Sequence, residues 1–226
     1  SFYETGTTFS NTVSFSTAGD NGNTRFSLTN LDNDDISPNS TLDRNSIGIN
    51  TSQNVGKNIR IDANLKYLLE DQSGNPRLSD GPGNANWIIN HTSPSVDVNW
   101  GKGPNGDGRN DDLSEFQMTP SIYIQNPWFA QNYYVNDSEK ERFIGSINMR
   151  WDLTDWLYAR ARVGADRYDL HRTQSEPFGT GYKPKGGINH YKLAFKQFDS
   201  DFFLGTDNLS LTAVSYTHLT LPTTTP

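Results

Sequence analysis

The chain has 226 residues, a formal net charge of −7 and no cysteine, and 33% of its residues are hydrophobic while 12% are aromatic. The negative charge argues against a nucleic-acid partner, and without cysteine the chain forms neither disulfides nor thiolate metal sites. Nowhere do about 18 apolar residues follow one another, so no transmembrane helix is predicted.

Three short strands are predicted in the N-terminal part of the chain, and in each of them apolar and polar side chains alternate. Such alternation places the two kinds of side chain on opposite faces of an extended strand. The apolar members are Val13 and Phe15, Phe26 and Leu28, and Ile47 and Ile49.

Three longer runs with the same period of two follow, over residues 59–69, 143–153 and 157–166. A strand that crosses a bilayer obliquely needs about 9–11 residues, whereas strands of soluble proteins are nearer to about 5–6. Charged residues at nearly every second position suit a polar lumen better than a soluble core. A further strand is predicted near Tyr191, Leu193 and Phe195, interleaved with Lys192 and Lys196.

Short and long connections alternate along the chain. Short turns are predicted at residues 18–23, 53–58, 152–156 and 205–208, and long links at 32–43, 70–138 and 169–189. Because successive connections of antiparallel neighbours lie at opposite ends of a sheet, one end carries tight turns and the other carries large loops. We therefore predict an all-β fold of antiparallel up-and-down strands that forms part of a large outer-membrane β-barrel.

Aromatic residues lie near both ends of the long predicted strands. Trp151 and Trp156 flank a short turn, while Tyr67, Phe143 and Tyr168 lie toward the long links. These positions predict aromatic girdles at the two membrane interfaces, although aromatic residues also favour strands in general.

The two ends of the chain differ from the rest. The N-terminus has no initiating methionine and no leader sequence, so we expect it to come from the middle of a longer protein. Residues 213–226 resemble the translation of a sequencing adapter, and we exclude them from the predicted partial barrel, residues 1–212.

Several short strings occur in order over most of residues 1–212. They are FYETG at residues 2–6, NTVSFS at 11–16, RFSL at 25–28, ISPNS at 36–40, NPW at 126–128 and RFIG at 142–145. In order and spacing they resemble the SusC/RagA family of TonB-linked outer-membrane transporters. That family usually has glycine where this chain has Asp35, and tyrosine where it has Trp128. Both departures concern turn detail.

The resemblance implies a 22-stranded barrel that holds a plug and draws energy from the inner membrane through the TonB complex. It also implies the outer membrane of a Gram-negative, Bacteroidetes-like bacterium, surrounding outer-membrane lipid, and a SusD-like surface lipoprotein as partner. The implied function is import of an oligomeric nutrient, an oligosaccharide (glycan) or a peptide. The plug and the TonB box are missing from these residues.

Two sets of side chains are candidates for contact with substrate. The aromatic set lies in the longest link and comprises Trp87, Trp100, Trp128, Tyr133 and Tyr134. We expect chiefly that this long link folds on itself and uses these rings as a small core of its own. The charged set is predicted to face the lumen and comprises Arg60, Lys66, Arg150, Arg160 and Arg162. Such charges can guide an anionic substrate, but more often they pair with the plug or with neighbours such as Asp62, Asp152 and Asp166.

Little in the chain predicts catalysis or metal binding. Residues 105–115 are acidic, but Arg109 occupies a position where a calcium loop needs an oxygen ligand. No nucleophile elbow, zinc motif or phosphate-binding glycine loop is present. We therefore expect no enzymatic activity, no cofactor and no metal. One alternative is a secreted carbohydrate-binding β-sandwich or solenoid without transport activity. Another is a small closed eight-stranded membrane barrel.

Overall fold

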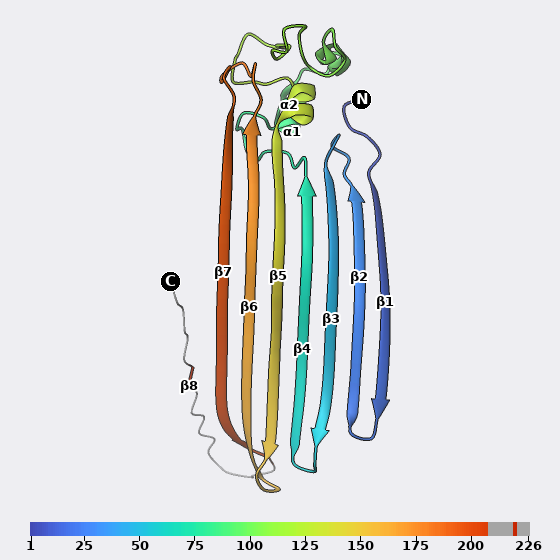
Figure 1. Cartoon of the computed structure of the whole chain (residues 1–226), viewed down its shortest axis with the longest axis vertical. Helices are drawn as coiled ribbons and strands as arrows, with labels where there is room; N and C mark the ends of the chain where they lie inside the picture. The colour runs from blue at the N-terminus through green and yellow to red at the C-terminus, as the bar shows by residue number, and fades with distance from the viewer. Residues whose placement is uncertain (208–218, 221–226) are drawn as a thin grey trace.

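The computed structural model describes residues 1–207 and 219–220. Its strands form one antiparallel sheet in which every strand pairs with its sequence neighbours, in the order β1 to β8 (Figure 1). The strands are β1 (Thr7–Gly19), β2 (Gly22–Asp34), β3 (Thr41–Val55), β4 (Ile59–Ser73), β5 (Val135–Asp152), β6 (Leu157–Glu176), β7 (Gly187–Thr206) and the two-residue β8 (Leu219–Thr220). The predicted all-β, up-and-down architecture is confirmed. Most of the tail predicted at 213–226 lies outside the described residues.

Three helical segments lie in the link between β4 and β5. They are α1 (Ala85–His91), a 3₁₀ helix (Val98–Lys102) and α2 (Pro127–Tyr133). Among the described residues, none of these helices has the length and hydrophobicity to cross a bilayer.

The strands are longer than the alternating runs predicted. The strands that contain the second and third long runs extend to Val135 in β5 and to Glu176 in β6. With the longer strands, the links shrink to residues 35–40, 74–134 and 177–186. Beyond the apolar runs both faces of the sheet are polar, so the period-two signal disappears while the hydrogen-bonded ladder continues. The predicted boundaries of the long links were therefore wrong by several residues at most ends.

The register keeps one apolar face continuous across seven strands. Phe15 pairs with Phe26, Phe26 with Ile49, and Ile49 with Leu65. The same row continues through Gly145 and Ala165 to Phe198. Because paired residues point to the same side of a sheet, these side chains all lie on one face, which we call the apolar face.

The strand predicted near Tyr191 is present as part of β7, and its apolar residues Tyr191, Leu193 and Phe195 lie on the face opposite the apolar face. Phe195 pairs with Tyr168, and Tyr191 pairs with Arg172, so both lie on the face that carries the charged side chains. The apolar face of β7 is instead formed by Phe198, Phe202 and Leu204, which pair with Ala165, Ala161 and Ala159. Alternation within a strand defines two faces, but only pairing with a neighbour decides which face is which.

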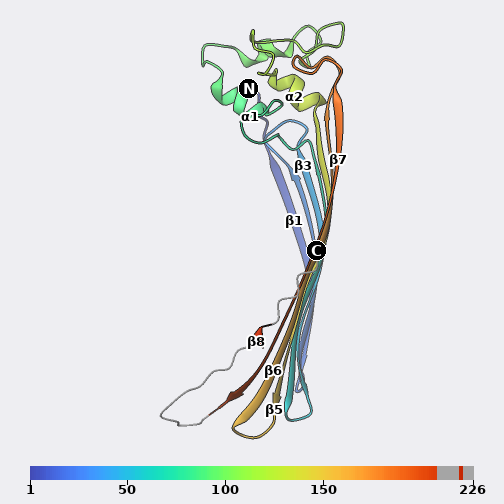
Figure 2. The ribbon, with the colours of Figure 1, turned by 90° about the vertical axis from the view of Figure 1, so that its left-hand side faces the viewer.

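The long links build a second body at one end of the sheet, which we call the loop cap. It consists of residues 74–134, with residues 177–186 and the N-terminal residues 1–6 packed against it. Its core contains Phe2, Ala85, Trp128, Phe129, Ala130 and Tyr134. Figure 1 shows the loop cap at the end opposite the short turns, and Figure 2 shows that it leans to one side of the curved, single-layered sheet.

Candidate functional site

The apolar face is exposed over the whole width of the sheet. Many large apolar side chains on it keep more than a third of their surface accessible, and no second layer of described residues covers them. They include Phe9, Val13, Phe15, Leu28, Ile47, Phe143, Ile147, Trp151, Val163, Phe198, Phe202 and Leu204. A water-soluble protein rarely leaves an apolar surface of this extent uncovered.

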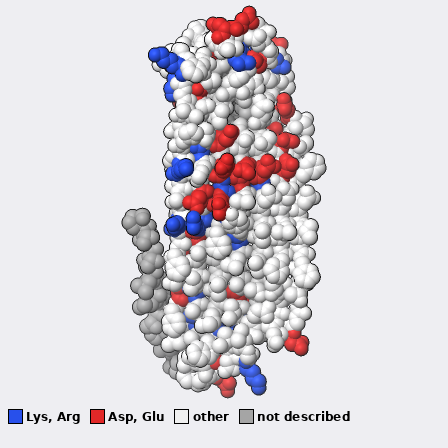
Figure 3. Space-filling model, viewed as in Figure 1, with Lys and Arg blue, Asp and Glu red and all other residues white. Residues whose placement is uncertain are grey.

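A row of acidic residues limits the apolar face toward the loop cap. Asp32, Asp43, Asp71 and Glu139 are direct cross-strand neighbours on β2, β3, β4 and β5. Figure 3 shows this face, with a band of acidic side chains above a broad area that is almost free of charge. Like charges placed directly opposite one another repel, so this row needs contact with water, and the uncharged area begins below it.

The boundary of the apolar face runs obliquely to the rows of paired residues. The row that contains Val13, Leu28 and Ile47 on β1 to β3 contains Arg167 on β6 and Lys196 on β7. Apolar side chains thus lie closer to the short turns in β7 than in β1. Such an offset is expected when strands are inclined to a flat apolar slab, as the strands of membrane barrels are.

The aromatic residues near the margins of the apolar face agree only in part with the predicted girdles. Trp151 and Trp156 lie exposed near the short turns, and Tyr67 pairs with Phe143 on the apolar face near the acidic row. The prediction that Tyr168 belongs to an aromatic girdle was wrong, because Tyr168 lies on the charged face, where it stacks on Phe195 at a centroid distance of 5.1 Å.

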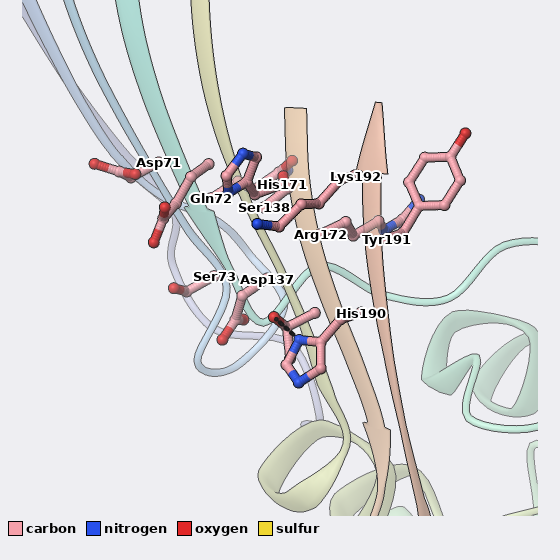
Figure 4. A pocket seen from close by; sticks show the side chains of 12 residues that line it. Asp71, Gln72, Ser73, Asp137, Ser138, His171, Arg172, His190, Tyr191 and Lys192 are labelled. Atoms are coloured by element: carbon pink, nitrogen blue, oxygen red, sulfur yellow. Dashed lines mark hydrogen bonds between the residues drawn. The ribbon is translucent and has the colours of Figure 1, made fainter. Parts of the chain in front are cut away.

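A hollow lies beside the acidic row, and Asp71 and Glu139 of that row are among its lining residues. It has a volume of about 400 Å³, and Asp71, Asp137, His171, His190 and Lys192 line it (Figure 4). His190 Nδ1 and Thr173 Oγ1 are 3.1 Å apart and hydrogen-bonded. The mixture of carboxylates and cations makes this hollow a polar surface feature between β4 and β7.

The opposite face, which we call the charged face, holds the predicted lumen residues in ordered rows. Arg60, Arg150 and Arg160 are cross-strand neighbours on β4, β5 and β6, and they border a hollow of about 410 Å³. Arg162 lies on the same face of β6, where it forms an ion pair with Asp201.

Most of these cations are neutralised by nearby carboxylates. Arg60 Nε lies 3.2 Å from Asp62 Oδ1, and Arg150 Nε lies 2.8 Å from Asp152 Oδ1. Arg150 also pairs with Asp207. The expected pairing with neighbouring carboxylates therefore holds for these two arginines.

The remaining members of the set differ from that expectation. Arg160 has its guanidinium 5.1 Å from the centroid of the Phe203 ring, and Lys66 is exposed without an ion pair in the part of the chain that the structure describes. Asp166 pairs with Arg142, with oxygen–nitrogen distances of 2.5 and 2.9 Å, rather than with a member of the predicted set.

The loop cap packs on the charged face at its upper end. Asn136 of β5 is 3% exposed, and its side-chain nitrogen donates to the carbonyl of Asn75 at 2.7 Å. Arg77 of the loop cap binds Glu176 at the end of β6 at 2.8 Å. In Figure 2 the loop cap accordingly leans away from the face that Figure 3 displays. If the sheet closed into a barrel with the charged face inside, this body would cover part of its mouth.

The five predicted aromatic residues do not form one surface. Trp128 and Tyr134 are each 8% exposed and belong to the core of the loop cap, and Tyr133 packs against that core. Trp87 stacks on His91 at 4.4 Å, whereas Trp100 is 55% exposed and contacts Phe116 edge-on. The expectation that the link uses most of these rings for its own packing is thus confirmed for Trp128, Tyr133 and Tyr134.

Asn126 organises the loop cap, and our sequence analysis missed its role. Its side-chain oxygen accepts hydrogen bonds from the backbone N–H of Trp128 and Phe129, which caps α2. Its side-chain nitrogen donates to the carbonyls of Gly101 and Phe116 at 2.5 and 2.8 Å. The signal was present in the sequence, because asparagine followed by proline at the first helical position is a typical helix start.

Glu115 is a second buried polar residue of the loop cap. It is 3% exposed, and its two carboxylate oxygens accept hydrogen bonds from the backbone N–H groups of Asn126 and Gly181, at 2.6 and 2.9 Å. Burial raises the pKa of the Glu115 carboxyl, and the two backbone hydrogen bonds oppose that rise. Glu115 thus joins the two links that build the loop cap.

The acidic stretch at 105–115 is occupied by protein contacts. Asp107 binds Arg109 at 2.9 Å and accepts a hydrogen bond from Tyr133 Oη. Burial works to raise the pKa of Asp107, but the hydrogen bonds from Tyr133 and Arg109 outweigh it and lower the pKa. These carboxylates therefore stabilise the loop cap itself.

Comparison with known proteins identifies the fold. No protein-family model and no curated protein matches the chain. Two solved structures of the RagAB peptide importer, in its closed-closed and open-open states, match with TM-scores of 0.58 and 0.54 and sequence identities of 15% and 13%. The matches cover 88% and 86% of this chain but 22% and 21% of the matched chains, so this chain spans about a fifth of their length.

Proposed function

We propose that this chain forms part of the wall of a TonB-dependent outer-membrane barrel that imports an oligomeric nutrient. The exposed apolar face carries the proposal. Seven paired strands present it without a covering layer, and the opposite face holds the charged residues. Hydrocarbon on one side and water or a plug on the other satisfy both faces.

Three further features support this proposal. The oblique boundary of the apolar face fits tilted strands, and the acidic row fits a margin in contact with water. Among the described residues, β1 has a strand partner on one side, and its other edge of 13 residues is available to pair with a further barrel strand.

The likeness to the RagAB peptide importer supports the transporter assignment and suggests a partner. By analogy, a SusD-like surface lipoprotein would lie over the loop cap, and the substrate would be a peptide or an oligosaccharide. Energy would come through TonB. The role we assign is binding and passage, with no chemical step. The same proposal includes a barrel of 22 strands, a Gram-negative host and the two candidate sets of substrate-contacting residues, aromatic and charged.

The β-sandwich alternative requires a second sheet, but the described residues contain a single sheet. A sandwich buries the inner faces of two sheets against each other. In this chain the side chains that would form such a core are exposed, as Ile147 and Val163 are.

Cell fractionation of the complete gene product tests the proposal. We expect the protein in the outer-membrane fraction, soluble only in detergent, with a mobility shift between unboiled and boiled samples on an SDS gel. Extraction into buffer without detergent, or equal mobility in both samples, would refute membrane insertion. A strain without TonB should retain the protein in the membrane but lose uptake, which separates location from energy coupling.

A further inference from the structure

The loop cap contains an apolar pocket that none of its own side chains fills. Its volume is about 200 Å³, and Trp87, Ile88, His91, Val96, Met118 and Ile124 provide most of its wall. A buried cavity of about 150 Å³ in another protein accommodates one benzene molecule. The pocket therefore has room for one large apolar side chain.

The pocket lining contains no aspartate, glutamate, lysine or arginine. Thr92, Ser93 and Thr119 also line the pocket, and their hydroxyls are hydrogen-bonded within the loop cap, to Ile88, Ser95 and Ser121. The most buried polar residue of the wall is Gln125, which is 1% exposed. Its oxygen accepts from the N–H of Gly83 at 3.0 Å, and its nitrogen donates to the carbonyl of Ile122 at 2.8 Å. Because Gln125 is engaged in the structure, it offers little to a polar ligand. A sugar ring would lose water from several hydroxyls and find fewer replacement partners than hydroxyls in this largely apolar wall, and this loss is unfavourable.

The exposed His91 adds a ring nitrogen to the pocket wall. His91 Nδ1 lies 2.8 Å from the backbone carbonyl of Trp87, and a carbonyl only accepts, so Nδ1 carries the hydrogen. In the neutral ring Nε2 is then an acceptor. An exposed acceptor beside an apolar pocket suits the N–H group of an extended peptide whose side chain enters the pocket.

The position of the pocket agrees with such a ligand. Trp87, Ile88 and His91 belong to α1, which Figure 2 shows on the side toward which the loop cap leans. That is the side of the charged face. A ligand seated there would lie at the mouth of the proposed barrel.

From these features we infer that the pocket between α1, Val96, Met118 and Ile124 binds one apolar side chain, of leucine or phenylalanine size, from a peptide substrate. This inference rests on the proposed function and selects peptide over oligosaccharide. The uncharged lining complements an uncharged side chain. Met118 provides a flexible wall that accepts several apolar shapes.

Calorimetry with two matched peptides tests the inference on the complete protein in detergent, together with any lipoprotein that copurifies. The probe is a heptapeptide of serine, glycine and asparagine with one leucine, and its partner has asparagine in place of that leucine. We expect the leucine peptide to bind at least about tenfold more tightly, because the pocket removes a leucine side chain from water. Equal affinities would overturn the inference.

A pair of variants locates the binding. Val96→Trp fills the pocket from a position that is 39% exposed, and Ile122→Trp makes the same change outside it at a position that is 44% exposed. Val96→Trp should abolish the preference for leucine, while Ile122→Trp should retain it. If Val96→Trp instead releases the lipoprotein and leaves peptide affinity unchanged, the pocket is a contact for the partner and the inference is wrong.

The gel-mobility test on the same preparation separates the two proposals. A retained shift with equal binding of both peptides overturns the pocket inference alone. A lost shift overturns the barrel, and with it the peptide site that rests on it.

Discussion

Ile147 of β5 and Val163 of β6 lie directly opposite each other on the apolar face, and they are 48% and 41% exposed. An adjacent cross-strand pair of this kind stabilises a sheet only modestly while its outer surface meets water. Contact of the same apolar side chains with hydrocarbon is favourable. The stability of this pair therefore depends on whether lipid or water contacts the apolar face.

The first prediction concerns Ile147. Replacing it with arginine should destabilise the membrane-inserted state by about 2–4 kcal/mol, the range measured for arginine on the lipid face of a barrel near the bilayer midplane. Asn148→Arg is the matched control, because Asn148 pairs with Asp62 and Arg162 on the charged face. Urea unfolding in lipid vesicles measures both variants, and equal destabilisation would contradict the assignment of the two faces.

The second prediction distinguishes the roles of two tryptophans. Trp128→Ala removes a core side chain whose indole nitrogen also donates to the carbonyl of Val98 at 2.9 Å, so we expect the loop cap to lose about 3–5 kcal/mol. Trp100 is 55% exposed, and Trp100→Ala should cost less than about 1 kcal/mol.

Hydrogen exchange of amides in residues 74–134 measures both effects within the intact protein. Rapid exchange in Trp128→Ala with near-normal exchange in Trp100→Ala is the expected result. Trp100→Ala would then be suitable for binding studies, because a loss of affinity could not come from unfolding. A loop cap that tolerates Trp128→Ala would contradict the core described above.

The sequence predicted the strands correctly where one face is apolar and the other polar. It missed the parts of the strands in which both faces are polar. Ile61 alternates with the charged Arg60 and Asp62, and Ile147 with the polar Ser146 and Asn148, which marks both strands in the apolar region. Between Val135 and Glu141 no such contrast exists, although β5 continues there. The same limit explains β7, whose alternation was visible while its orientation depended on pairing with β6.

The site was less predictable than the fold. Composition could place Trp87 and Trp128 in the same long link, but not decide which of them is buried. Burial depends on contacts between segments far apart in sequence, such as the edge-to-face contact of Phe2 with Trp128 at 5.0 Å. Glu115 was noticed as the end of an acidic stretch, but its role as a buried link was not predictable, because its partners Asn126 and Gly181 belong to different links.

The third prediction concerns Glu115 and pH. Its pKa in the folded state is raised above the ordinary glutamate value of 4.5, mainly by burial. The folded state therefore holds the proton more tightly than the unfolded state. Protonation of Glu115 favours the loop cap below that ordinary value, and this contribution is lost as pH rises through the raised pKa.

Glu115→Gln should remove this pH dependence and also weaken the loop cap at neutral pH. Glutamine has one acceptor oxygen, so either the N–H of Asn126 or that of Gly181 loses its partner, at a cost of about 1–3 kcal/mol. Native-state proteolysis of the loop cap across pH 4 to 8 measures both effects. Asp111→Asn, an exposed neighbour, is the control. An unchanged pH profile in Glu115→Gln would show that another group governs it.

The last prediction uses two glycines of the same loop, Gly106 and Gly108. Both have positive φ, +80° and +93°, so alanine is strained at either position by about 1–2 kcal/mol. A Cβ at Gly106 would meet nothing within 4 Å. At Gly108 it would overlap the backbone nitrogen of Phe129 and lie 2.8 Å from its Cα.

Gly108→Ala should therefore cost about 1–3 kcal/mol more than Gly106→Ala, because backbone cannot move aside as a flexible side chain can. The difference between the two variants cancels the shared cost of positive φ and isolates the close approach of this loop to α2. Hydrogen exchange at the amides of α2 provides the measurement, since α2 must shift if the loop is pushed outward. Equal protection of α2 in both variants would mean that the loop does not pack against Phe129.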